Sequence, residues 1–97
     1  MIEQKEFSGE GSYTTEMAIV DALHELGKAR SRYPWWPCDI VHATVIMVEE
    51  STEALKAANE IRWSHKSTDV NEFREEVIQT IAMCFRLLTE TEVERSE

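Results

Sequence analysis

The sequence predicts an all-α protein that folds as a single domain. Only three glycines and two prolines occur among its 97 residues, so few positions interrupt regular structure. Hydrophobic residues recur at helical spacing in long stretches that contain few β-branched runs. Hydrophobic residues make up 42% and charged residues 30% of the chain, which is typical of a folded domain and not of a disordered segment.

The first helix is expected to begin near residues 12–15, where serine and threonine hydroxyls can cap free backbone N–H groups. Its hydrophobic positions continue toward Arg32. Residues 1–11 are mostly polar and contain Gly9 and Gly11, so they are predicted to form a flexible lead-in. The folded domain is therefore expected to start at about residue 12.

Pro34 and Pro37 predict an extended break after the first helix. Proline lacks an N–H donor and disfavours helix in the residue before it. Asp39 can then cap a second helix, whose hydrophobic positions continue at helical spacing to about Trp63.

A short polar connection over residues 64–69 predicts that the second and third helices form an antiparallel hairpin. Asp69 and Glu72 resemble a capping pair at the start of the third helix. The domain is expected to span residues 12–89, and residues 90–97 are predicted to be an acidic C-terminal tail that frays.

The second helix has hydrophobic residues around most of its circumference and only a narrow polar strip. One chain with three helices cannot cover so much apolar surface. The sequence therefore predicts a helical bundle completed by oligomerisation, as a dimer or a tetramer of identical chains.

The balance of charge excludes several classes of partner. Lys and Arg number 10 and Asp and Glu number 19, which gives a net charge of −9. This sign disfavours duplex nucleic acid and anionic membranes, and it suits cation binding. No stretch approaches the roughly 18 apolar residues that span a bilayer, and residues 1–10 lack the features of a signal peptide, so the protein is expected to be cytoplasmic.

Acidic residues are grouped on the second and third helices. Glu49, Glu50 and Glu53 form a Glu-Glu-x-x-Glu run, and Glu76 and Gln79 repeat the same i, i+3 spacing. At about 100° per residue, positions i and i+3 lie about 60° apart on one helix face. In a hairpin these two groups lie at matching levels, and oxygen ligands suit Mg²⁺ or Mn²⁺. The alternative is that the glutamates form an ordinary solvated face.

This arrangement resembles the MazG-type all-α nucleoside triphosphate pyrophosphohydrolases. The resemblance covers residues 33–88, and residues 36–57 are similar to a phage and bacterial MazG-like branch. It implies Mg²⁺-dependent hydrolysis of a nucleoside triphosphate to a nucleoside monophosphate and pyrophosphate. It also implies that Glu50, Glu53, Glu76 and Gln79 are metal ligands and that Glu49 is a further ligand or orients the attacking water.

Gln79 departs from the family pattern, which usually has aspartate at this position. The amide oxygen of glutamine can still coordinate a cation, but it carries no charge and binds Mg²⁺ less well. A non-catalytic helical module that retains a nucleotide pocket with a weakened metal site is therefore the alternative hypothesis. A plain helix-mediated interaction protein is a third.

Three further residues are candidates for substrate binding. Lys56, one turn after Glu53, is placed to contact a phosphate or to pair within its own helix. Trp36, held between the two prolines with Trp35, offers a face for a base or packs in the core. His42 is expected either to bind a base or sugar or to form a hydrogen bond with the neighbouring backbone.

Overall fold

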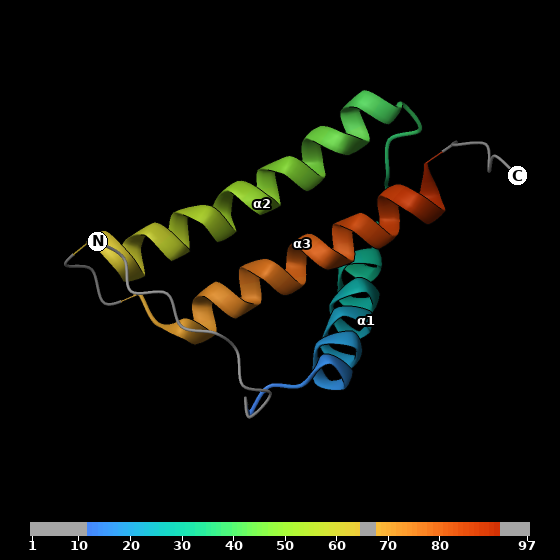
Figure 1. Cartoon of the computed structure of the whole chain (residues 1–97). Helices are drawn as coiled ribbons and strands as arrows, with labels where there is room; N and C mark the ends of the chain where they lie inside the picture. The colour runs from blue at the N-terminus through green and yellow to red at the C-terminus, as the bar shows by residue number, and fades with distance from the viewer. Residues whose placement is uncertain (1–11, 65–67, 92–97) are drawn as a thin grey trace, which may run out of the picture.

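The chain forms three helices: α1 (Thr15–Arg32), α2 (Ile40–Trp63) and α3 (Val70–Glu90). The computed structural model describes residues 12–64 and 68–91, and these contain no strand. The all-α prediction is therefore confirmed. The lead-in predicted for residues 1–11 lies outside the described residues. Figure 1 shows α2 and α3 side by side and antiparallel, with α1 crossing α3 on its other side.

Each helix begins at a side chain that caps its first turn. The Thr14 hydroxyl accepts a hydrogen bond from the N–H of Met17 at 3.1 Å, and the Asp39 carboxylate accepts one from the N–H of His42 at 2.8 Å. The Asp69 carboxylate does the same for the N–H of Glu72 at 2.9 Å. The helix starts predicted from these residue types are confirmed, because capping is a local i, i+3 interaction.

The end of α3 differs from the predicted boundary at residue 89. Glu90 is the last residue of the helix, and Thr91 is buried. Glu90 accepts hydrogen bonds from two arginines, and Thr91 accepts one from Trp36. The contacts from Arg30 and Trp36 are long-range, and they hold two residues that the acidic composition alone assigned to the tail. The rest of that tail lies outside the described residues.

Alanines make up four of the six buried hydrophobic residues in the part of the chain that the structure describes. Ala22 and Leu26 of α1 are buried, as are Ala43 and Ala57 of α2, and α3 contributes Ile78 and Ala82. Alanine lets helix backbones approach closely and loses no side-chain entropy on burial. The Cα atoms of α3 come within 8 Å of both other helices, whereas those of α1 and α2 do not approach each other to this distance. The central helix α3 therefore holds the structure together.

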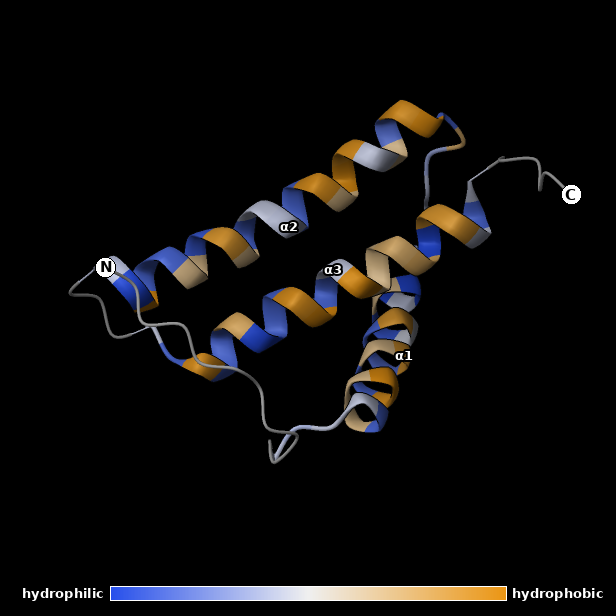
Figure 2. Cartoon of the chain, viewed as in Figure 1, coloured by the Kyte–Doolittle hydropathy of each residue, from blue (hydrophilic) through white to orange (hydrophobic). Residues whose placement is uncertain are grey.

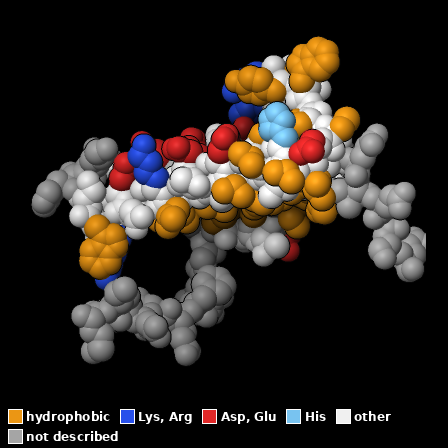
Figure 3. Space-filling view, turned by 90° about the horizontal axis from the view of Figure 1, so that it is seen from above, with side chains coloured by type: hydrophobic (Ala, Val, Ile, Leu, Met, Phe, Trp, Pro, Cys, Tyr) orange, Lys and Arg blue, Asp and Glu red, His pale blue; other side chains and the backbone are white. Residues whose placement is uncertain are grey.

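Large hydrophobic side chains remain exposed on α1 and α2. Figure 2 shows hydrophobic residues along much of α2, and Figure 3 shows a band of hydrophobic side chains beside a row of acidic ones on the face of the molecule that α2 forms. The exposed residues include Val20 and Leu23 of α1 and Val41, Val45 and Val48 of α2. Within the described residues, no helix is long and apolar enough to cross a membrane.

Candidate functional site

The segment between α1 and α2 is fixed to the end of α3 by Arg86. This guanidinium is 2% exposed, and it donates hydrogen bonds to the Glu90 carboxylate at 3.0–3.2 Å and to the Tyr33 carbonyl at 2.9 Å. Arg30 reaches the same carboxylate from α1 at 2.9 Å. These contacts therefore join α1, the segment that follows it and the end of α3.

Trp36 is held by the same network. The guanidinium carbon of Arg86 lies 4.7 Å from the centre of the Trp36 ring, and the indole N–H donates to the Thr91 hydroxyl at 2.8 Å. A cation over a tryptophan face is attracted by the electron density of the ring. One face of Trp36 is therefore covered by Arg86, while Trp35 beside it is 87% exposed.

A cavity of about 510 Å³ lies where the three helices and this segment meet. Its volume is within the range of small-molecule sites. Its aromatic wall consists of Tyr33, Trp35 and Trp36, its carboxylate and amide side chains are Glu25, Glu50 and Gln79, and its two cations are Arg32 and Arg86. The cavity therefore combines flat rings with groups that bind charged or hydrogen-bonding ligands.

Other carboxylates act on Glu50, which lines this cavity. Partial burial raises the pKa of Glu50, and the charges of Glu76, Glu53, Glu49 and Glu25 raise it further. Burial likewise raises the pKa of Glu76, with smaller contributions from neighbouring glutamates. Among the described residues, no lysine or arginine forms an ion pair with Glu49, Glu50, Glu53 or Glu76. The fold thus gathers negative charge without compensating it.

The donor set suits a hard cation in its chemistry. Glu50, Glu53 and Glu76 supply charged oxygen atoms, which Mg²⁺ and Mn²⁺ prefer. Across residues 12–64 and 68–91, however, no group of three or more His, Cys, Asp or Glu side chains is close enough to hold a metal ion. Mutual repulsion favours separation of uncompensated carboxylates. The predicted ligands therefore share one region without forming a coordination shell, and Gln79 lies in the cavity with Glu50.

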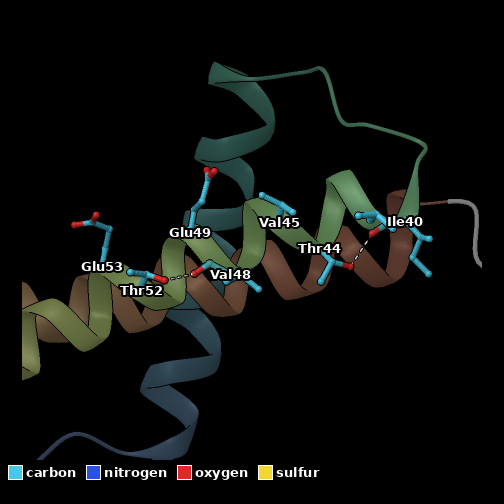
Figure 4. A pocket seen from close by; sticks show the side chains of 8 residues that line it. Ile40, Thr44, Val45, Val48, Glu49, Thr52 and Glu53 are labelled. Carbon is cyan, nitrogen blue, oxygen red and sulfur yellow. Dashed lines mark hydrogen bonds between the residues drawn. The ribbon is translucent and has the colours of Figure 1, made fainter.

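Glu49 and Glu53 do not line this cavity but a second, more apolar depression on α2, which we call the outer groove. It has a volume of about 590 Å³ and is lined by residues between Ile40 and Glu53. Figure 4 shows the Glu49 and Glu53 side chains extending to the same side of α2, while Thr44 points away from them. The Thr44 and Thr52 hydroxyls donate to backbone carbonyls of their own helix. Hydrocarbon surface therefore dominates the rest of this groove.

Two of the predicted substrate-binding residues lie away from the cavity. Lys56 and His42 are exposed on α2, and neither lines the cavity between the helices. Trp36 does line it. Of the three residues, the fold thus brings only Trp36 to the side of Glu50 and Gln79.

Glu25 and Arg32 line the cavity but were missed by the sequence reasoning. Both belong to α1, on the face that continues from Ala22 through Ala29. Their helical spacing from the buried Ala22 and Leu26 predicts that both residues lie at the edge of the packed face of α1. This spacing does not predict which helix packs against that face.

No protein-family model, curated protein or solved structure matches this chain.

Proposed function

We propose that this protein is a MazG-like, Mg²⁺- or Mn²⁺-dependent nucleoside triphosphate pyrophosphohydrolase. The observation that carries the proposal is the position of Glu50. It lines a cavity with three aromatic side chains and is electrostatically coupled to Glu53 and Glu76. A nucleotide needs both features, because its base stacks on flat rings and its phosphates require cations held by carboxylates.

In the proposed reaction, water and a nucleoside triphosphate give a nucleoside monophosphate, pyrophosphate and a proton. The water oxygen forms the new bond to phosphorus, and the bond to the bridging oxygen between the α- and β-phosphates breaks. Bound Mg²⁺ would neutralise charge that develops on the phosphates and help to position the water. Glu50, Glu53 and Glu76 would hold the ion, with the Gln79 amide oxygen as a weaker ligand. Glu49 would orient the water.

Oligomerisation is part of this proposal. The outer groove contains Val41, Val45 and Val48, which are 68%, 46% and 48% exposed. Burying such surface against a second copy is favourable by about 25 cal/mol per Å² of apolar area. A dimer or tetramer would also place a neighbouring chain close to Glu49 and Glu53, which border the same groove.

The decisive experiment measures pyrophosphate release from each ribo- and deoxyribonucleoside triphosphate with Mg²⁺ or Mn²⁺. The parent chain is compared with Glu50→Gln, Glu53→Gln and Glu76→Gln. Glu16→Gln, on the exposed first turn of α1, is the matched control. We expect activity in the parent and the control and its loss in the three site variants. Equal activity in all five proteins, or none in the parent with any substrate, would contradict the proposal.

A non-catalytic nucleotide-binding module is the second candidate. The neutral Gln79 and the separation of the carboxylates in the described residues favour it. This candidate predicts that nucleotides raise the melting temperature of the chain while no pyrophosphate is released, because any ligand of the folded state stabilises it. A pyrophosphate assay and a melting assay on the same samples distinguish the two functions.

A further inference from the structure

Two arginines line the cavity, and only one of them already binds other residues in the part of the chain that the structure describes. Arg86 is committed to Glu90 and the Tyr33 carbonyl. Arg32 also lines the cavity, and it makes no hydrogen bond or ion pair with any other residue that the structure describes. It is exposed at the last turn of α1. Its guanidinium is therefore available to a ligand.

Arg32 also borders a third depression, of about 300 Å³, between α1 and α3. The cavity and this third depression share Arg32, Glu25 and Gln79, so they are adjoining parts of one polar region. The other cations of the third depression have partners: Lys28 pairs with Glu25 at 3.2 Å, and Arg74 lies over the Tyr13 ring. Among the described residues, Arg32 thus differs from these two cations in having no partner for its guanidinium.

An anionic ligand would meet a largely negative site. Glu25 and Glu50 line the cavity with Arg32, and the charges of Glu53 and Glu76 act on Glu50. A phosphate chain entering here is repelled unless positive charge faces it. Arginine suits this role because its planar guanidinium donates two parallel hydrogen bonds to one phosphate.

We infer that Arg32 binds the phosphate chain of a nucleoside polyphosphate whose ring lies against the wall containing Trp35. The inference rests on the proposed function and adds a substrate-binding residue to it. It also assigns to α1 a role that the sequence pattern suggested for Lys56 of α2. Lys56 is likewise without a partner among the described side chains, but it does not line the cavity.

The test measures binding of the α,β-methylene analogues of ATP, GTP, CTP and UTP by calorimetry with Mg²⁺ present. These analogues keep the triphosphate but resist cleavage between the α- and β-phosphates. The analogue that binds the parent most tightly, and the nucleoside with the same base, are then measured with Arg32→Gln, Lys56→Gln and Arg62→Gln. Each variant removes one positive charge from an exposed position, so all three change the net charge equally.

We expect Arg32→Gln to weaken binding of the triphosphate analogue about tenfold, the effect of losing hydrogen bonds to a charged group. Nucleoside binding should stay unchanged, because the nucleoside has no phosphate. Arg62→Gln should behave as the parent, since salt screens distant exposed charges. Arg32→Lys should lose less affinity than Arg32→Gln.

Two results would overturn the inference: Arg32→Gln binds the triphosphate analogue as tightly as the parent does, or Lys56→Gln loses more affinity than Arg32→Gln. If either result is found while the parent releases pyrophosphate, the proposed function stands and only the assignment of Arg32 is wrong. If the parent binds none of the four analogues and releases no pyrophosphate, both are wrong.

Discussion

Replacing Arg86 by methionine should destabilise the fold more than any change to a surface charge. The side chain is 2% exposed, and it joins Glu90, the Tyr33 carbonyl and the Trp36 ring. Removing one member of a buried ion pair costs about 3–5 kcal/mol when the remaining charge has no partner. Glu90 is 24% exposed and keeps Arg30, so this penalty is reduced. We therefore expect a loss of about 2–3 kcal/mol.

Urea unfolding at neutral pH, followed by far-ultraviolet circular dichroism, measures this loss. The matched control is Arg30→Gln, which removes the other arginine from the same carboxylate. Arg30 is 47% exposed, so its ion pair should contribute less than about 1 kcal/mol. In a domain of this size the Arg86→Met change corresponds to a fall in melting temperature of roughly 10–20 °C.

Equal losses in the two variants would show that burial of Arg86 does not set its contribution to stability. A change of less than about 0.5 kcal/mol in the free energy of unfolding of Arg86→Met, the range of ordinary surface substitutions, would show the same. Tryptophan fluorescence of the same samples separates a local loss of Trp36 packing from global unfolding. Helix content that stays constant while the fluorescence shifts would indicate a local change.

The remaining predictions concern charge and assembly. Gln79→Asp should tighten Mg²⁺ binding by adding a carboxylate, and equal melting shifts for variant and parent across a Mg²⁺ titration would contradict this. Partial burial opposes ionisation of Glu90, but hydrogen bonds from two arginines outweigh this effect and lower its pKa from 4.5. The Glu90 carboxylate therefore stabilises the fold above that pH, and its contribution is lost as the pH falls. The pKa values of Glu50 and Glu76 are raised, so the metal-free fold gains stability from their protonation as the pH falls. Glu90→Gln and Glu50→Gln should therefore change the dependence of unfolding on acid pH in opposite directions. Val45→Lys should dissociate the predicted oligomer, and light scattering that finds the parent monomeric at 11.2 kDa would contradict that prediction.

The sequence predicted the features that depend on near neighbours. Thr14, Asp39 and Asp69 identify helix starts because a cap acts three residues along the chain. The proximity of Glu50 to Glu76 followed from the short connection between two helices, and their electrostatic coupling agrees with it. These features need only helical geometry and one hairpin.

The cavity could not be predicted in the same way. Glu25 and Arg32 reach it because α1 crosses α3, and no sequence spacing specifies that crossing. Arginine is usually found at the surface, yet Arg86 is buried because a carboxylate, a carbonyl and an aromatic ring surround it. Charged side chains are seldom fully buried without such partners. Glu90 lies one turn further along the same helix, whereas the Tyr33 carbonyl and the Trp36 ring come from a distant part of the chain.

Because α3 lies between the other two helices, α1 can detach while α2 and α3 stay paired. Since α1 packs on α3 and does not approach α2, its detachment would open the cavity without separating the paired helices. Glu25 and Arg32 would leave with α1, whereas Glu50, Glu53 and Glu76 would remain on the hairpin. Amide protons of α1 can therefore exchange with solvent through a partial opening that leaves α2 and α3 protected. Such an opening would release a ligand from the cavity while the acidic residues of the hairpin keep their arrangement.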